Sequence, residues 1–360
     1  MESRPPAGPG SSSASTLYDV ARAAKVSTAT VSRVVNGLQG VRPVTRRRVL
    51  DAIETLGYVP DGAAQSLAQR RTEVIGLVAV ESRGPETDVE RESFLFIEDV
   101  LRGVERSVGE LGWSVLISFL RGPDLADAYQ RMQKISAKVD GLVIAEGIVG
   151  PEQLALLAAR VPVALIAAYP RGVHADVIGA DNRSGSQAMV RHLIEEHGKT
   201  RLFYVAGPAE APDAQERCSA FEEEVARHPG VTVAGIFAGR FAAVSGQQAV
   251  RQILSRPRRE LPDAIVCGND QTAIGAMREL QAAGIRVPAD VAVVGFDDIH
   301  LSALLSPTLT TVRQPMRLLG ERACSLLLER IADPSLPPRA ERLPTELVIR
   351  ESCGCHPALP

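Results

Sequence analysis

The stretch that decides the fold at the amino-terminal end is "TLYDVARAAKVSTATVSRVVNG", residues 16–37. It contains two short helical patterns, and each gathers apolar residues on one face: Leu17, Val20, Ala21 and Ala24 in the first, Val31, Val34 and Val35 in the second. Only "KVS" separates them, which predicts a tight turn with Ser27 capping the second helix. A third pattern over residues 45–56, stopped by Gly57, completes a predicted three-helix unit.

A helix-turn-helix places its second helix in the major groove of DNA, with side chains near that helix's N-terminus reaching the base edges. Five side chains form the exposed face of the predicted second helix here: Thr28, Ala29, Ser32, Arg33 and Asn36. The donor fork of Arg33 fits guanine, and the methyl groups of Ala29 and Thr28 fit thymine. Ser32 or Asn36 can position a phosphate. The pattern leaves an alternative open, a helical pair with a solvated charged face.

Charge is divided unevenly along the chain. Residues 16–72 carry nine basic and four acidic groups, a net charge of +5, although the whole chain has a net charge of −3. The charges of residues 1–15 cancel, so residues 73–360 carry −8. This segregation favours a small head that meets a polyanion, attached to a body that does not.

From residue 73 onward, short apolar runs alternate with amphipathic helical patterns. Nine runs predict strands: "VIGLVAV", "WSVLISF", "GLVIAE", "PVALIAAY", "DVIGAD", "RLFYVAG", "GIFAG", "AIVCGN" and "VAVVGFDD". The predicted helices include 97–111, 125–138, 151–160, 183–197, 214–228, 245–255, 270–283 and 316–332. This rhythm predicts an α/β fold of parallel sheets covered on both faces, and two doubly wound lobes suit nine strands better than one. Ligands of such sheets bind beyond the carboxyl ends of the strands.

Composition narrows the class of protein. The opening "MESRPPAGPGSSSAS" predicts a disordered leader over residues 1–15, and no run reaches the about 18 apolar residues of a membrane helix, so we expect a soluble, cytoplasmic protein. Five scattered cysteines without CxxC spacing predict reduced thiols. We interpret the "CGC" of residues 353–355 as two incidental cysteines without nearby His or Asp ligands, and we expect no metal site. The alternative is a redox or metal handle.

Two other classes of protein fit the sequence less well. A secreted solute-binding protein would need a secretion signal and no basic head, and this chain shows the reverse. A nucleotide-dependent enzyme would need a GxGxxG or GxxxxGK[ST] motif or a catalytic grouping, and the sequence has none of these. Six single histidines are interpreted as surface or packing residues: His174, His192, His197, His228, His300 and His356. We therefore expect no catalytic residues and no cofactor.

The quoted stretch, followed by "TRRRVLDAIETLGYVP" and "AQSLA", resembles the headpiece and hinge of the lactose/galactose repressor (LacI/GalR) family. The resemblance continues through "VIGLV", "LRGVE", "DGLVI", "IVCGNDQTAIGAMRELQAAGIRVPADVAVVGFDD", "SPTLTTVRQP" and "LVIRES". It implies a helix-turn-helix headpiece, a hinge helix, and a two-lobed core like a periplasmic binding protein, with crossovers near residues 178, 313 and 343. The implied ranges are a headpiece at 16–60, a hinge at 61–72, a core at 73–352 (lobe 1 about 73–177 and 314–343, lobe 2 about 178–313 and 344–352) and a tail at 353–360.

The resemblance also implies a function: a homodimeric transcription regulator, a repressor, bound to a pseudo-palindromic double-stranded DNA operator under allosteric control by a small polar effector such as a sugar. The implied DNA-contacting residues are Thr16, Leu17, Ser27, Thr28, Ala29, Ser32, Arg33, Asn36, Thr45, Tyr58 and Leu67. Leu67 would wedge into the minor groove, and the alternative is that it packs on the core. Asp61 departs from the neutral polar residue usual at the hinge start and would repel phosphate, unless it caps the hinge helix.

The effector residues implied by the resemblance are Phe96, Asp213, Arg217, Phe241, Asn269, Gln271, Asp297 and Gln314, with Asp270 beside them. Their carboxylate, amide and guanidinium groups can bind hydroxyls in pairs, and Phe241 offers a flat apolar face, which fits a polyol or similar ligand. Ala145 and Ala167 stand where sugar-binding relatives often place polar residues. The ligand is then bulkier, less polar, or held mainly by the second lobe. An insertion before the first core helix adds Phe94 or Phe96 as cleft candidates.

Overall fold

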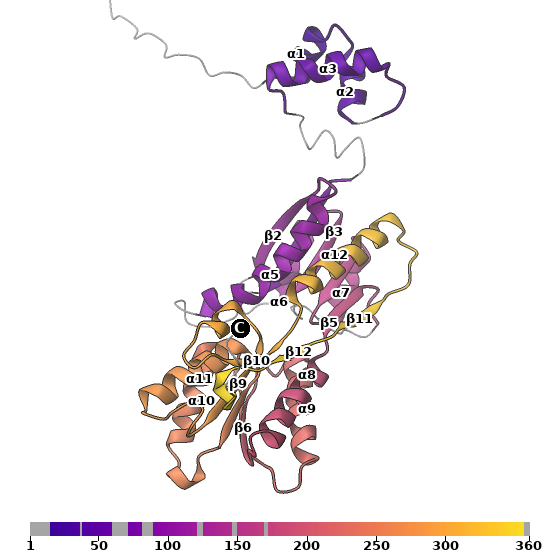
Figure 1. Cartoon of the computed structure of the whole chain (residues 1–360). Helices are drawn as coiled ribbons and strands as arrows, with labels where there is room; N and C mark the ends of the chain where they lie inside the picture. The colour runs from indigo at the N-terminus through magenta and orange to yellow at the C-terminus, as the bar shows by residue number, and fades with distance from the viewer. Residues whose placement is uncertain are drawn as a thin grey trace, which may run out of the picture. The chain divides into compact units, whose positions relative to one another are not determined.

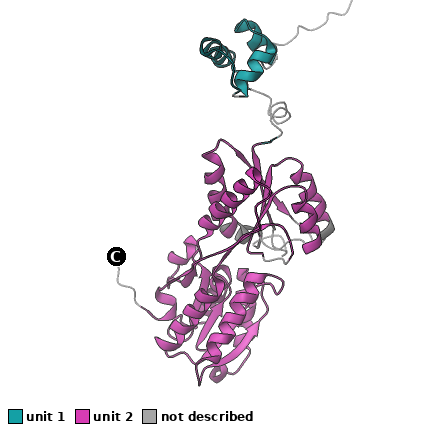
Figure 2. Cartoon of the chain, turned by 90° about the vertical axis from the view of Figure 1, so that its right-hand side faces the viewer, with its two compact units in different colours: residues 1–72 teal, residues 73–360 magenta. Residues whose placement is uncertain are grey.

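The computed structural model describes residues 15–36, 38–59, 71–80, 89–120, 125–145, 150–168 and 172–355. The chain forms two compact units, residues 1–72 and residues 73–360 (Figure 2). Among the described residues, no helix has both the length and the apolar character needed to span a membrane. Residues 1–14 of the predicted leader, Asp61, Leu67 and the end of the tail lie outside the described residues. Ser15, the last leader residue, donates to the carbonyl of Leu56 at 2.8 Å.

The described part of the first unit is a bundle of three helices: α1 Leu17–Ala23, α2 Thr28–Val35 and α3 Pro43–Leu56 (Figure 1). Thr16 caps α1 in a reciprocal box with Asp19, and Ser27 caps α2 as predicted. The third helix ends at Gly57, whose φ of 56° is the left-handed conformation that glycine adopts without strain. Apolar residues from all three helices form its core: Val20, Ala21, Ala24, Val31, Val34, Val49 and Ala52.

The described part of the second unit contains two six-stranded sheets. The first sheet is parallel, with the order β11-β5-β4-β3-β1-β2. Its strands are β1 Val74–Val80, β2 Ser114–Leu120, β3 Gly141–Ala145, β4 Val163–Ile166, β5 Asp176–Ala180 and β11 Ala340–Leu343. One face is covered by α5 Val89–Gly109 and α12 Met316–Ala332, the other by α6 Leu125–Ser136 and α7 Pro151–Ala158. We call this sheet with its helices lobe 1.

The second sheet has the order β12-β10-β9-β8-β6-β7 and is parallel except for β12, which pairs antiparallel to β10. Its strands are β6 Arg201–Val205, β7 Thr232–Phe237, β8 Ala264–Cys267, β9 Ala292–Asp297, β10 Thr310–Arg313 and β12 Glu346–Val348. One face is covered by α8 Asn182–Glu195 and α9 Pro212–Ala226, the other by α10 Ala243–Leu254 and α11 Asp270–Ala282. This sheet with its helices is lobe 2. The predicted α/β class of two doubly wound lobes is confirmed.

Two local predictions differ from the structure. The sequence rhythm found nine strands and missed β10, β11 and β12, because each is only three or four residues long and carries too little apolar periodicity. The first core helix begins at Val89 rather than at residue 97, so part of the predicted insertion is helical. The side chain of Phe94 lies outside the described residues.

The chain passes between the lobes three times: from β5 to α8, from β10 to α12, and from β11 to β12. The lobes also pack together, because Ile299 of lobe 2 belongs to the same apolar cluster as Ile97 and Met316 of lobe 1. The β10–α12 crossover follows β10 at the carboxyl edge of the lobe 2 sheet. Polar groups at this edge therefore lie next to a segment that joins both lobes.

Candidate functional site

The second helix of the headpiece presents the predicted DNA-reading face to solvent. Arg33 and Ala29 are exposed, and Thr28, the first residue of α2, is half-buried. Ser27 fixes the start of the helix, because its side chain accepts the backbone N–H of Thr30 at 3.2 Å. The opposite face of α2 is buried in the headpiece core. Arg33 therefore projects from a helix whose orientation is set by its cap and its apolar face.

Other predicted DNA contacts have partners within the headpiece. Asn36 donates from Nδ2 to Oγ of Ser32 at 3.2 Å, so these two polar side chains bind each other. Thr16 donates its hydroxyl to Asp19 at 2.6 Å as part of the α1 cap. Two further residues pack partly against the headpiece core: Leu17 and Tyr58. These groups shape the headpiece, and their contacts with DNA stay a prediction, as does the role of Leu67.

The third helix carries the basic run of the headpiece. Thr45 is half-buried in its first turn. Arg46 donates from Nη2 to the carbonyl of Leu38 at 2.8 Å, which ties α3 to the loop after α2. Arg47 and Arg48 are exposed. Exposed guanidinium groups beside a recognition helix suit a phosphate backbone, because they neutralise charge without reading sequence.

In lobe 2, the predicted effector residues gather where the parallel strands end. Asp297 is the last residue of β9, and Gln314 follows β10. Asn269 follows β8, and Phe241 lies in the loop between β7 and α10. Asp213 stands in the first turn of α9. The doubly wound topology thus brings five segments that are distant in sequence to one edge of the sheet.

Arg217 lies at the centre of this group and is only 4% exposed. It donates from Nε to Oδ1 of Asn182 and from Nη1 to the carbonyl of Gly268, each at 2.8 Å. Nη1 also lies 3.5 Å from Oδ1 of Asp297. The guanidinium carbon sits 3.8 Å from the centroid of the Phe296 ring, within the range of a cation–π contact. Arg217 is therefore not a solvated residue on the surface of its helix.

Two buried carboxyl groups flank this guanidinium. Asp297 accepts a hydrogen bond from Nε2 of Gln314 at 2.6 Å. Burial raises the pKa of Asp297 to about 6, although Arg217 opposes the shift. Burial also raises the pKa of Asp213, whose Oδ2 lies 3.8 Å from Nη2 of Arg217. The other oxygen of Asp213 is buried with no hydrogen-bond partner in the described part of the chain, an arrangement that a ligand hydroxyl would relieve.

Asn269 shapes the wall beside the cluster. Its Oδ1 accepts the backbone N–H of Thr272, which caps α11, and its Nδ2 donates to the carbonyl of Phe241 at 3.0 Å and to Gln271. Phe241 has a φ of 58°, and its ring packs so closely on Gly207 that a Cβ there would lie 2.3 Å from it. Because Gly207 has no side chain, the Phe241 ring can pack at this position. Its centroid lies 5.5 Å from the guanidinium carbon of Arg217.

Asp270 does not join the cluster, contrary to the expectation from the sequence. Its Oδ2 accepts bonds from Oγ of Ser302 at 2.6 Å and from the backbone N–H of Ile299 at 2.9 Å. Its Oδ1 accepts the hydroxyl of Thr311 at 2.5 Å. Burial, followed by the charge of Asp297, raises the pKa of Asp270 to about 8. Asp270 therefore ties α11 to β10 and to the loop after β9.

Lobe 1 contributes less to the described site. Phe96 packs partly against the lobe 1 core cluster, which Ile299 of lobe 2 also joins. Ala145 is buried at the end of β3, and Ala167 is buried just after β4. The segments 81–88, 121–124, 146–149 and 169–171, which follow the first four strands, lie outside the described residues. The described part of the candidate site is therefore the half that belongs to lobe 2.

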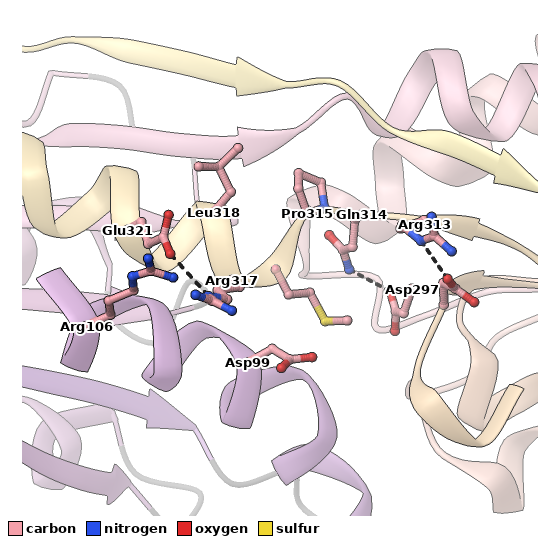
Figure 3. Close-up of a pocket in the computed structure, with 11 residues that line it drawn as sticks. Asp99, Arg106, Asp297, Arg313, Gln314, Pro315, Arg317, Leu318 and Glu321 are labelled. Carbon is pink, nitrogen blue, oxygen red and sulfur yellow. Dashed lines mark hydrogen bonds and ion pairs between the residues drawn. The ribbon is translucent and has the colours of Figure 1, made fainter. Parts of the chain in front are cut away.

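An open groove of about 530 Å³ lies beside the cluster, at the crossover from β10 to α12 (Figure 3). Asp297 and Gln314 line one end of it, and the hydrogen bond between them is drawn in Figure 3. Farther along, Arg317 pairs with Glu321 at 3.2 Å on α12. Arg217 does not line the groove. The charges of the buried cluster are desolvated, whereas those on α12 are paired at the surface.

The sequence missed one member of the cluster, Asn182. It is fully buried as the first residue of α8, accepts from Arg217, and donates from Nδ2 to Glu216 at 3.3 Å. A signal was present, because the polar pair of Asp181 and Asn182 directly follows the strand "DVIGA". Such a pair at the end of a parallel strand is a candidate for the ligand edge.

The interpretation of "CGC" as lacking nearby ligands is wrong. His192 and His197 lie beside Cys353 and Cys355, and all four ligand atoms are within 4.8 Å of one another. Two other histidines have ordinary side-chain contacts: His174 with Arg330 at 2.9 Å and His228 with Glu224 at 3.3 Å. The four-residue group lies apart from the Arg217 cluster.

A helix-turn-helix unit followed by a two-lobed body, with a buried polar cluster at its strand ends, defines the class of ligand-responsive DNA-binding regulators. Residues 16–61 match the model of bacterial regulatory proteins of the lacI family, and residues 190–353 match a periplasmic binding protein-like domain. The chain belongs to the LacI family of bacterial regulatory proteins. The family, fold class and regulatory function predicted from the sequence are thereby confirmed.

Similar proteins match over nearly the whole chain. The chain is 34% identical over 341 residues to the HTH-type transcriptional repressor PurR of Aliivibrio fischeri strain MJ11, covering 94% of this chain and 98% of that protein. It is 33% identical over 346 residues to the ribose operon repressor of Escherichia coli strain K12, covering 94% and 99%. Among solved structures, the lac repressor dimer bound to operator and the anti-inducer ONPF matches with a TM-score of 0.82, 28% identity, and coverage of 95% and 99%.

Proposed function

We propose that this protein is a homodimeric repressor that binds a pseudo-palindromic operator and responds to a hydroxyl-rich effector held by the Arg217 cluster. The observation that carries the effector assignment is the buried oxygen of Asp213, which has no partner among the described residues and lies beside a buried guanidinium. A ligand hydroxyl would supply the missing donor. The same ligand could accept from Arg217, so neighbouring hydroxyls would be bound in pairs.

The chemistry of the cluster favours a polar ring with one flat face. Asp213 and Asp297 offer acceptors, Arg217 offers donors, and Phe241 offers an aromatic wall within 5.5 Å of the guanidinium. An apolar effector would leave these desolvated groups unpaired, which would cost affinity. Sugars, polyols and nucleosides therefore form the proposed ligand class, held mainly by lobe 2 because Ala145 and Ala167 add no polar group from lobe 1.

On the DNA side, the exposed fork of Arg33 would read guanine in each half-site, with Ala29 and Thr28 against thymine methyl groups. Two headpieces of a dimer would then read a two-fold symmetric operator. The similarity to a repressor dimer solved on its operator supports this arrangement. We assign no catalytic activity to the chain, and we place it in the cytoplasm because its proposed target is chromosomal DNA.

Coupling between the sites would run through the β10–α12 crossover. Gln314 lies in this crossover and donates to Asp297 in the cluster, while Met316, two residues later, packs in the lobe 1 core. A ligand that competes for Asp297, or strengthens its bond to Gln314, would therefore favour one lobe arrangement over another. By linkage, operator binding and ligand binding would then bias each other by the same factor.

The test is a thermal-shift screen of the full-length protein against sugars, polyols, nucleosides and their phosphates. A ligand at about 100 times its Kd should add about 2.7 kcal/mol to the free energy of unfolding. Asp213→Asn should abolish most of the shift, whereas Asp290→Asn, at an exposed Arg286 pair, should keep it. Equal shifts in both variants would overturn the assigned site.

The DNA part has a separate measurement. Fluorescence anisotropy with DNA from around its own gene should show sequence-specific binding, and the active ligand should change that affinity. Binding that shows only a salt-dependent background, with no sequence preference, would overturn the repressor assignment.

A further inference from the structure

Four metal-ligating side chains meet on lobe 2, at the sheet edge opposite to the effector cluster. His192 lies in the last turn of α8, and His197 follows just after that helix. Cys353 ends the short helix Glu351–Cys353, and Cys355 comes two residues later. The two pairs are more than 150 residues apart in sequence, so only the fold brings them together.

The sheet edge is identified by the contacts of the cysteine segment. Oγ of Ser352 donates to the carbonyl of Val293, near the start of β9, and accepts the backbone N–H of Thr310, the first residue of β10. The segment therefore sits at the amino ends of the strands, whereas Asp297 and the ligand cluster lie at the carboxyl ends. The group is thus separate from the proposed effector site.

Four of the six distances within the group match the edges of a tetrahedron. Nε2 of His192 lies 3.3 Å from Nε2 of His197 and 3.4 Å from Sγ of Cys353. Sγ of Cys355 lies 3.3 Å from Nε2 of His197 and 3.7 Å from Nε2 of His192. Zinc bonds of about 2.3 Å to sulfur and about 2.0–2.1 Å to nitrogen imply tetrahedral edges of about 3.3–3.8 Å. These four separations fall at the edge lengths, and the ligand atoms of all four residues lie within 4.8 Å of one another.

The local structure is arranged to hold both thiols toward the histidines. Gly354, between the cysteines, has a φ of 113°, and a Cβ there would lie 3.2 Å from the ring of His197. The two imidazole rings stand edge to face, with 80° between their planes and centroids 4.9 Å apart. His192 and Cys353 are 9% and 1% exposed, so half of the ligand set is already shielded from water. The turn at Gly354 and the two imidazole rings thus bring all four ligand atoms within 4.8 Å of one another.

We propose that His192, His197, Cys353 and Cys355 form a structural Cys2His2 site for a soft divalent cation of the zinc class. On binding, both thiols lose their protons, so two thiolates and two neutral imidazoles give an electrically neutral tetrahedral complex with no open position. The ion fastens the carboxyl-terminal segment to α8. Since this segment follows the last crossover and continues β12, the site clamps the returning end of the chain onto lobe 2.

The experiment uses untagged full-length protein, because a polyhistidine tag would itself bind metal. Protein purified under reducing conditions should contain about one zinc ion per chain by mass spectrometry of the elements. The apo-protein titrated with Co²⁺ should develop the intense visible absorption of a tetrahedral site with thiolate ligands. Removing the metal with a chelator should lower the melting temperature, and added Zn²⁺ should restore it.

Matched variants locate the site. Cys355→Ser and His197→Gln should each reduce the zinc content at least about tenfold, since loss of one ligand opens the closed tetrahedron. Cys218→Ser and His300→Gln, at a half-buried cysteine and an exposed histidine of the same lobe, should keep it. Circular dichroism of each variant separates loss of metal from loss of fold.

Three results would overturn the proposal: reduced protein without zinc and without a Co²⁺ spectrum, equal zinc content in the ligand and control variants, or a Cys353–Cys355 disulfide that persists in reducing buffer.

Discussion

Nη1 of Arg217 lies 3.5 Å from Oδ1 of Asp297, with only 5% and 6% of the two side chains exposed. This contact joins helix α9 to the end of strand β9. Asp297 in turn accepts from Gln314, which lies in the crossover between the lobes. The Asp297 carboxylate therefore links the guanidinium of Arg217 to this crossover. A ligand that replaces either contact would act on the segment that links the two halves of the body.

Replacing this arginine should damage the fold as well as the site. Arg217→Met removes the cation between two buried carboxyl groups, and leaving such a charge uncompensated costs about 3–5 kcal/mol. Urea unfolding measures the loss. Arg251→Met, at an exposed pair with Glu279, should cost about 1 kcal/mol or less. A similar small loss for both variants would show that the Arg217 contacts contribute little.

Stability should fall as pH rises because of Asp270. Its pKa is raised to about 8 in the folded protein, so between about pH 4 and pH 8 the native state holds a proton that the unfolded chain has released. The free energy of unfolding therefore decreases with pH in this window, by up to about 1.4 kcal/mol per pH unit. Asp270→Asn should flatten the dependence between about pH 6 and pH 8, as followed by urea unfolding. Equal slopes in variant and wild type would contradict this assignment.

The sequence-reading role of Arg33 predicts a selective loss. Arg33→Ala should weaken operator binding by about 1–3 kcal/mol and leave binding to random DNA little changed. Anisotropy titrations on both DNAs measure the difference. Arg22→Ala, at an exposed arginine of α1, should not change the ratio of the two affinities. If Arg33→Ala weakened both DNAs equally, Arg33 would be a phosphate contact.

The wedge role of Leu67 predicts a change in DNA shape. Leu67→Ala should reduce both operator affinity and the bend of the duplex, because a methyl group cannot hold two base pairs apart. Bending is measured by energy transfer between dyes at the ends of the operator. Leu156→Ala, at an exposed leucine of α7, is the control. An unchanged bend angle would favour packing of Leu67 on the body.

A pair of glycines in α5 tests the packing of lobe 1. A Cβ at Gly103 would lie 2.0 Å from the carbonyl of Arg317, so Gly103→Ala must force α5 and α12 apart. We expect a loss of about 2 kcal/mol or more in urea unfolding. Gly109→Ala, in the same helix, meets only the flexible end of Glu105 at 3.4 Å and should stay within about 0.5 kcal/mol. Equal effects would show that the close helix contact relaxes easily.

Local signals explain what was predictable in the fold. Ser27 and Gly57 mark helix ends through their own backbone preferences, and both do so in the structure. The long apolar runs of the central strands were recognised for the same reason. The short strands β10, β11 and β12 at the crossovers are not recognised from the sequence, because three or four residues of mixed polarity show no alternation of apolar and polar positions. Asp270 was misplaced because residue type and strand position do not reveal which way a side chain points.

The sequence by itself determined the basic three-helix head, the alternation that produces two doubly wound lobes, and the residue types gathered at the strand ends. Tertiary structure alone decided that Arg217 is buried, that Asp270 bonds to Ser302 and Thr311, and that His192 and Cys355 are 3.7 Å apart. The physical reason is the range of the interactions. Helix caps and apolar periodicity act within a few residues, whereas burial, hydrogen-bond partners and ligand groups arise from contacts between segments separated by up to 164 residues.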